Sequence, residues 1–79
     1  MRVRVKVFAT LAQYIAGVKA ATPFDVDIAD GATVADLARQ LNLPGQEVKT
    51  IFVNGRAQPL SHVLKPGDEI GIFPPVGGG

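Results

Sequence analysis

The sequence predicts a small α+β domain, in which a mixed sheet of four to five strands packs against one main helix. Hydrophobic and charged residues alternate at the start of the chain, in MRVRVKV, with the period of a half-buried strand. A hydrophobic stripe at helical spacing follows in residues 33–41, and further alternating segments come after it. Because strands lie on both sides of a single long helix in the sequence, we expect one sheet with that helix across one face.

Composition restricts the classes of function. The 79 residues provide for one modest core, and 47% hydrophobic with 19% charged residues is typical of a globular domain. A net charge of +1 favours neither nucleic acid nor an anionic membrane as a partner. The sequence has no apolar run of about 18 residues, as a membrane-spanning helix needs, and its start does not resemble a signal peptide. We therefore expect a cytoplasmic protein.

Residues that could perform catalysis are scarce. The chain has no cysteine, which excludes disulfides, thiolate nucleophiles and cysteine-ligated zinc. Its single histidine, His62, has no cluster of ligands or catalytic partners near it in the sequence. We therefore expect no metal site and no catalytic residues in this chain itself.

The first two strands are predicted from alternation. The first covers residues 2–7, with its three valines facing inward and its charged residues outward, and Phe8 continues on the outward side. Residues 9–21 are expected to form an irregular connection with one short helical turn. A second strand over residues 24–28 again alternates hydrophobic with acidic residues, so one of its faces should be buried.

The main helix has both start and stop signals. Thr33 is expected to cap its first turn, with Asp36 three residues later completing a short capping box. Asn42 and the Pro44-Gly45 pair should end the helix near Leu41. The hydrophobic stripe consists of Val34, Leu37, Ala38 and Leu41.

The second half of the chain is expected to complete the sheet. A third strand over residues 51–53 ends in Asn54-Gly55, the strongest two-residue signal for a hairpin, and residues 56–57 form a short return strand. Pro66-Gly67 has the two residue types that a type II turn requires at its centre. The last strand covers residues 69–73, with its two isoleucines inward.

Residues 74–79, PPVGGG, have an unusual composition. Two prolines hold the backbone extended, and glycine has no Cβ, so a narrow channel in another protein could close around the three glycines. Fully extended, six residues reach about 20 Å. A frayed terminus is the alternative, because chain ends are often small and disordered. The rigid spacer favours a thin probe that presents a terminal carboxylate.

A carboxylate becomes reactive once it is adenylated, and this chain has neither phosphate-binding pattern, GxxxxGK[ST] or GxGxxG. We therefore expect no bound cofactor and expect ATP to be used by a partner enzyme. A lysine that attacked the acyl-adenylate would form an isopeptide. A sulfur donor would instead form a thiocarboxylate, whose anionic sulfur is a good nucleophile.

Four segments resemble the MoaD/ThiS-like sulfur carriers, in particular the small subunit of molybdopterin synthase. In chain order they are VKVFATL, DGATVADLARQL, IFVNG and GDEIGIFPPVGGG, and together they extend over essentially the whole chain. The resemblance implies a ubiquitin-like β-grasp fold. It further implies a sulfur carrier domain over residues 1–73 and an extended diglycine tail over residues 74–79.

The resemblance also implies the chemistry of the tail. Gly79 would be adenylated by a ubiquitin-activating-enzyme-like adenylyltransferase and converted to a thiocarboxylate with sulfur from a donor such as a persulfide-bearing protein. The large subunit of molybdopterin synthase would then use that sulfur in molybdenum cofactor biosynthesis. The tail residues that partners would recognise are Gly78, Gly77, Val76, Pro75 and Pro74.

Phe8 and Phe73 are expected to form a docking surface. Both lie on the outward side of their strands, and in the β-grasp fold the first and last strands are parallel neighbours. The two rings would then form one exposed apolar patch beside the tail. The alternative is that single exposed aromatic residues are common and carry no function.

Three other functions remain compatible with this terminus. The chain could carry sulfur for thiamine thiazole or another pathway, although the two prolines favour the molybdopterin pathway. It could be a ubiquitin-like modifier that is conjugated to lysines. It could also be a β-grasp adaptor whose tail does not react.

Overall fold

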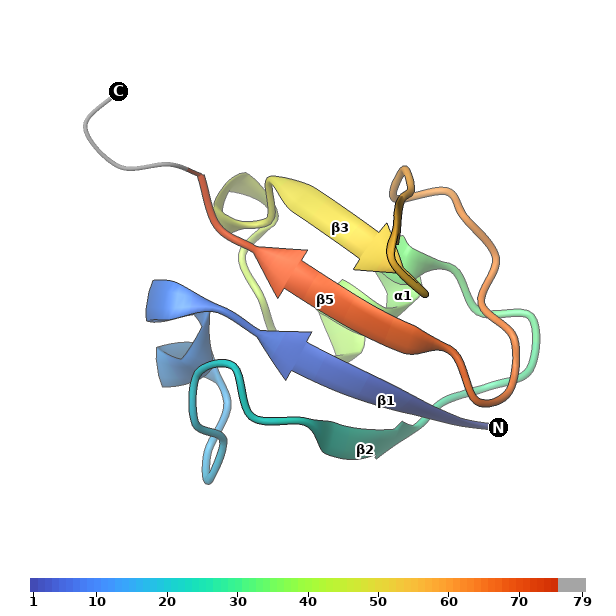
Figure 1. Cartoon of the computed structure of the whole chain (residues 1–79), viewed down its shortest axis with the longest axis horizontal. Helices are drawn as coiled ribbons and strands as arrows, with labels where there is room; N and C mark the ends of the chain where they lie inside the picture. The colour runs from blue at the N-terminus through green and yellow to red at the C-terminus, as the bar shows by residue number, and fades with distance from the viewer. Residues whose placement is uncertain (76–79) are drawn as a thin grey trace.

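The computed structural model describes residues 1–75, which form a five-stranded mixed sheet with one α-helix across one of its faces (Figure 1). The elements are β1 (Arg2–Val7), the 3₁₀ helix η1 (Ala9–Tyr14), β2 (Phe24–Asp27), α1 (Val34–Gln40), the 3₁₀ helix η2 (Gly45–Glu47), β3 (Thr50–Val53), β4 (Arg56–Ala57) and β5 (Glu69–Phe73). The strand order is β2-β1-β5-β3-β4. β1 and β5 are parallel and the other pairs are antiparallel, which confirms the predicted α+β class.

The core lies between the sheet and α1. Val5 and Ile72, which come from the two central strands, have no exposed surface, and neither has Leu37 of the helix. The inward direction predicted for the valines of β1 and the isoleucines of β5 is therefore confirmed. The buried hydrophobic residues are Val3, Val5, Val7, Leu11, Val26, Ile28, Ala32, Val34, Leu37, Ala38, Leu43, Ile51, Val53, Leu64, Ile70 and Ile72.

Helix α1 begins and ends as the sequence predicts. The Thr33 hydroxyl accepts a hydrogen bond from the Asp36 backbone N–H at 3.2 Å, and the Thr33 N–H donates to the Asp36 carboxylate at 2.9 Å. These bonds hold the pKa of Asp36 below its ordinary value, the backbone N–H of Thr33 having the largest effect. At the other end, Asn42 adopts φ +59 and the Leu43 N–H reaches the Ala38 carbonyl, the closure of a Schellman motif.

This C-terminal turn corrects the predicted stripe. Leu41 was expected to be buried, but it is half-buried, and Leu43 is buried in addition. The left-handed residue Asn42 ends the helix, and Leu43 after it packs in the hydrophobic core.

The connection after β1 is more regular than expected. Residues 9–14 form the six-residue 3₁₀ helix η1, and Leu11 within it is completely buried. Ala9 starts this helix at φ +51, a backbone conformation that residues other than glycine rarely adopt. A second 3₁₀ helix, η2, follows the Pro44 turn and was not predicted.

The Asn54-Gly55 hairpin is confirmed, with φ of +52 and +83 at its two central residues, as a type I′ turn requires. A polar cluster fixes this hairpin to the start of β5. The Asn54 amide nitrogen donates to Asp68 Oδ1 at 2.9 Å, and the Lys65 backbone N–H donates to Asp68 Oδ2 at 2.8 Å. Gly67 lies between these partners at φ +82, as the expected type II turn requires.

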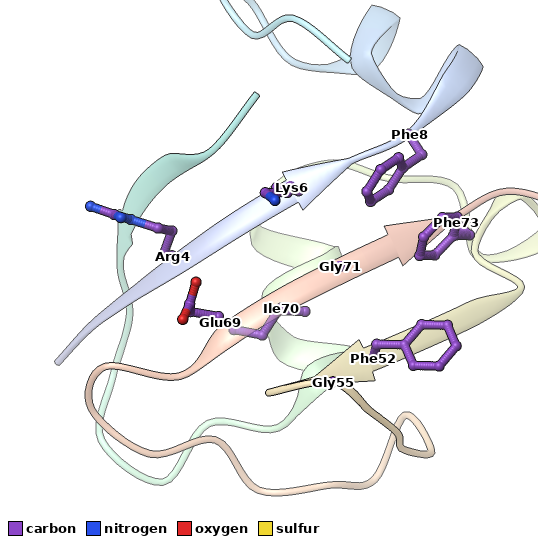
Figure 2. A pocket seen from close by; sticks show the side chains of 9 residues that line it. All are labelled: Arg4, Lys6, Phe8, Phe52, Gly55, Glu69, Ile70, Gly71 and Phe73. Atoms are coloured by element: carbon purple, nitrogen blue, oxygen red, sulfur yellow. The ribbon is translucent and has the colours of Figure 1, made fainter. Parts of the chain in front are cut away.

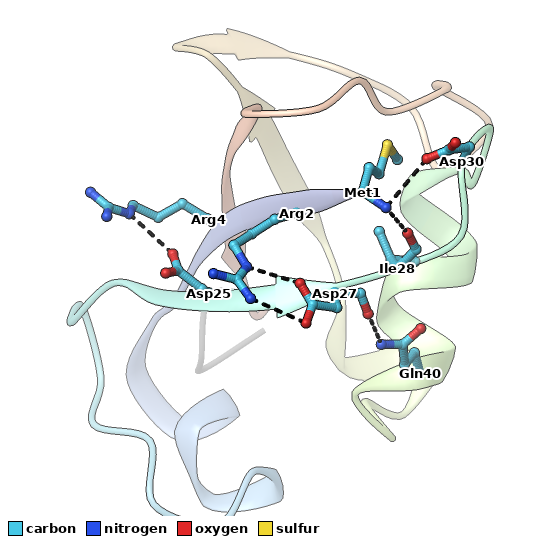
Figure 3. A network of polar contacts seen from close by, with 8 residues as sticks. All are labelled: Met1, Arg2, Arg4, Asp25, Asp27, Ile28, Asp30 and Gln40. Carbon is cyan, nitrogen blue, oxygen red and sulfur yellow. Dashed lines mark hydrogen bonds and ion pairs between the residues drawn. The ribbon is translucent and has the colours of Figure 1, made fainter.

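Exposed ion pairs line the pairing of β1 with the edge strand β2 (Figure 3). Arg2 makes two contacts with the Asp27 carboxylate, at 2.9 and 3.3 Å. That hydrogen bonding, and secondarily the positive charge of Arg2, holds the pKa of Asp27 below its ordinary value. The Gln40 amide donates to the Asp27 carbonyl at 2.8 Å and so joins α1 to the same edge. In the described part of the chain, no helix is long and apolar enough to cross a membrane.

Candidate functional site

The candidate site is the face of the sheet that turns away from α1. Because Val7 pairs with Ile72 in the parallel register of β1 and β5, the next residues, Phe8 and Phe73, come side by side. Their rings stack with centroids 4.0 Å apart and planes 5° from parallel. The expected contact between these two rings is therefore present, and both side chains are half-buried (Figure 2).

A third ring belongs to the same cluster and was not singled out from the sequence. Phe52 of β3 meets Phe73 edge to face, with centroids 5.7 Å apart and an interplanar angle of 83°. It remains 37% exposed. The alternation of β3 could have identified it, because Ile51 and Val53 are buried and the residue between them must face outward.

These three rings border a shallow hollow of about 230 Å³, shown in Figure 2. Enclosed sites for small molecules usually have volumes of roughly 300–1,000 Å³. The hollow is smaller and lies open on a sheet, so it suits a side chain of another protein better than a cofactor. Its lining residues are Arg4, Lys6, Phe8, Phe52, Gly55, Glu69, Ile70, Gly71 and Phe73.

The end of the hollow away from the rings is charged. Arg4 lies opposite Glu69 in register, and its guanidinium also pairs with Asp25 at 3.5 Å. Lys6 of β1 precedes Phe8 by two positions, and it makes no ion pair within residues 1–75. The same residues contain no group of three or more histidine, aspartate or glutamate side chains that could hold a metal ion.

The tail begins where β5 ends. Phe73 is the last residue of β5, after which Pro74 is half-buried and Pro75 exposed. The other expected tail residues, Val76, Gly77, Gly78 and Gly79, lie outside the described residues. The aromatic cluster therefore lies at the base of the segment expected to react.

Comparison with known proteins gives the family. Residues 5–79 match the ThiS family. The chain belongs to that family. ThiS-family proteins are small non-catalytic carriers, and the suspected MoaD/ThiS-like relationship is thereby confirmed. A search of curated proteins finds no match.

Solved structures similar to this ThiS-family chain share its β-grasp fold. SAMP1, small archaeal modifier protein 1, from Haloferax volcanii is 30% identical over the whole of both chains, with a TM-score of 0.70. A putative molybdopterin converting factor subunit 1 from Pyrococcus furiosus is 31% identical over 95% of this chain and 98% of its own, with a TM-score of 0.69.

A third structure contains a complex. One chain in a Helicobacter pylori complex of subunits 1 and 2 of molybdopterin-converting factor is similar to this chain. It is 25% identical over the full length of both chains, with a TM-score of 0.62. The β-grasp fold is thus established, and these similar structures include both a modifier and a molybdopterin-converting factor.

Proposed function

We propose that this ThiS-family chain carries sulfur as a thiocarboxylate on Gly79 and donates it in molybdopterin synthesis, as the small subunit of molybdopterin synthase. The proposal rests chiefly on the tail, FPPVGGG, which begins at the aromatic cluster. Similarity over 95% of this chain to a putative molybdopterin converting factor subunit 1 from Pyrococcus furiosus, and over its full length to a chain of the Helicobacter pylori complex, supports the pathway.

The chemistry needs three steps in partner enzymes. The Gly79 carboxylate attacks the α-phosphorus of ATP, pyrophosphate leaves, and an acyl-adenylate forms in a ubiquitin-activating-enzyme-like adenylyltransferase. A persulfide-bearing protein then displaces AMP through its terminal sulfur and gives an acyl disulfide. A thiol attacks the donor sulfur of that disulfide, which releases the Gly79 thiocarboxylate and leaves a disulfide behind. This chain supplies the carboxylate and the surface that positions it.

The second partner is the large subunit of molybdopterin synthase. Its active site would receive the tail while the aromatic cluster of Phe8, Phe52 and Phe73 docks beside it. Glycine at the last three positions suits a narrow channel, since no Cβ widens the backbone. The only group of this chain that would react in the transfer is the thiocarboxylate on Gly79.

A second function has specific support. SAMP1 is a modifier protein by name and is about as similar to this chain as the Pyrococcus furiosus protein is. Conjugation to lysine begins with the same adenylation, but an amine, not sulfur, attacks the activated Gly79. The two functions therefore differ in the product that the terminus forms.

Intact-mass measurement decides between them. The chain is incubated with its adenylyltransferase, ATP and a sulfur donor, and we expect the mass gain for replacement of one oxygen by one sulfur. The matched control lacks Gly78 and Gly79, leaves every buried core residue in place, and should keep its melting temperature without acquiring sulfur. Isopeptide products without thiocarboxylate would favour the modifier function. A truncated chain that still gained sulfur would contradict the proposed site.

A further inference from the structure

Gly71 lies at the centre of the outer face. In the register of the sheet it is opposite Lys6 on β1 and opposite Phe52 on β3. Along its own strand its same-face neighbours are Glu69 and Phe73. Every position around it thus carries a large side chain, while Gly71 carries none, and this difference creates the hollow (Figure 2).

The missing side chain is not required by the fold. A Cβ placed on Gly71 would lie 3.5 Å from Phe8 Cε2 and 3.6 Å from Phe73 Cε1, which is ordinary van der Waals contact. The backbone there does not have the positive φ of Gly55 or Gly67. Because glycine is unfavourable inside a strand, an alanine should be tolerated or even stabilising. Alanine therefore fits at this position without displacing the two rings, and the absence of a side chain leaves the centre of this face open.

The hollow also has two chemically different ends. The rings of Phe8, Phe52 and Phe73 form the apolar end. At the other end the positive charge of Arg4 is shared with Asp25 and lies opposite Glu69, so Lys6 is the cation left to meet a charge from outside. An occupant should be apolar where it contacts the rings and anionic where it reaches Lys6.

We propose that the hollow over Gly71 receives one apolar side chain of the adenylyltransferase, with a carboxylate of that enzyme beside it to pair with Lys6. This inference rests on the proposed function and defines how the enzyme recognises its carrier. The adenylyltransferase is the chosen partner because both thiocarboxylate and isopeptide formation begin with it. Phe73 lines the hollow and Pro74 follows it directly, so an enzyme seated there contacts the chain where the tail begins.

Two pairs of variants test the proposal. Gly71→Val fills the hollow, and Gly45→Val is its matched control, because Gly45 lies beside α1 in open space and without a positive φ. Lys6→Glu reverses the charge at the hollow, and Lys65→Glu makes the same change in the loop before β5. Affinity for the purified adenylyltransferase is measured by calorimetry without ATP, so the result does not depend on reaction at the terminus.

We expect Gly71→Val and Lys6→Glu each to raise Kd about tenfold, and both controls to stay within about twofold of the parent Kd. Lys6→Glu and Gly71→Ala should keep melting temperatures near that of the parent chain, whereas the Cγ atoms of Gly71→Val extend beyond a Cβ that already contacts both rings and should lower it. In ATP–pyrophosphate exchange, the same variants should raise the KM for the carrier and leave kcat unchanged. Gly71→Ala fills less of the hollow and should have an intermediate Kd. Such a graded loss of affinity would show that misfolding of the Gly71→Val chain is not its cause.

Unchanged affinity in both hollow variants would overturn the inference, even if the parent chain forms a thiocarboxylate. A lower kcat at constant KM would overturn it as well, because that result would place these residues in the reaction and not in docking. If the hollow variants lose affinity but the parent chain never acquires sulfur, the docking inference stands and the proposed sulfur carriage fails.

Discussion

The two faces of the central strands differ in a way that separates stability from recognition. On the inner face Val5, Val7 and Ile72 are completely buried against α1. On the outer face, Lys6, Phe8 and Phe73 alternate with those same residues and remain accessible at least in part. Since successive side chains of a strand point to opposite faces, one short sequence can encode a core and a docking surface independently. Changes on one face should therefore leave the property of the other largely intact.

The largest effect is expected on the inner side, at Leu37 of α1. Leu37→Ala should lower the free energy of unfolding by about 2–5 kcal/mol, because the side chain is completely buried and a cavity would remain. Denaturant unfolding measures this loss. Leu60→Ala is the matched control, since Leu60 is 45% exposed, and it should cost far less. Equal losses in both variants would break the assignment of stability to the inner face.

Asp68 sharpens the comparison, because it is a polar residue that should also contribute to stability. Asp68 is 8% exposed, and its carboxylate accepts hydrogen bonds from the Asn54 amide and from the Lys65 N–H. Asp68→Ala should destabilise the domain by about 1–3 kcal/mol, since both donors would lose their partner. Thermal unfolding of this variant measures the loss of stability, and Glu69→Ala, at an exposed position, is the control. Equal melting temperatures for Asp68→Ala and Glu69→Ala would mean that the hydrogen bonds of Asp68 do not stabilise the fold.

On the outer face, Phe73→Ala should act mainly on binding. We expect the free energy of binding to the adenylyltransferase and to the large synthase subunit to weaken by about 1–3 kcal/mol. The loss of stability should be smaller than for Leu37→Ala, because it comes from two ring contacts, each worth about 0.5–1.5 kcal/mol, on a half-buried face. Calorimetry and thermal unfolding on one sample give both quantities. Undiminished binding with a large drop in melting temperature would show that Phe73 is a core residue.

The smallest effect concerns pH and the edge strand β2. The folded pKa of Asp27 is lowered by Arg2, so the pair contributes stability above the ordinary carboxyl pKa, near pH 4, and loses it as the pH falls through the lower folded value. Asp27→Asn should lower the melting temperature slightly at neutral pH, where the pair contributes, and should match the parent chain at low pH, where the contribution is already lost. An Asp25→Asn control, at the longer ion pair, should have a weaker effect. Identical pH profiles of the melting temperature for Asp27→Asn and the parent chain would contradict this contribution.

The sequence allowed the sheet and α1 to be predicted because alternation, the Thr33 cap and the Asn54-Gly55 turn are local signals. Leu43 and Leu11 were missed as core residues because their burial depends on left-handed turns at Asn42 and Ala9. An alanine in such a turn carries no sequence signal.

At the candidate site, the contact between Phe8 and Phe73 followed from parity together with the parallel strand order that the family resemblance implied. Phe52 could have been found by the same parity rule. The hollow over Gly71 could not, because it depends on the register of three strands that are distant in sequence.

The position of β5 has a consequence for the time at which the carrier becomes usable. β5 is the last strand to be synthesised, yet it lies between β1 and β3 in the middle of the sheet. Before it emerges from the ribosome, the two halves of the sheet have no shared partner, and contacts this distant in sequence form late in folding. Residues 69–73 also supply Phe73 and Gly71 to the docking face. An activating enzyme that reads this face would therefore reject unfinished chains, because a nascent chain cannot present the surface before it has made the strand that leads into the tail.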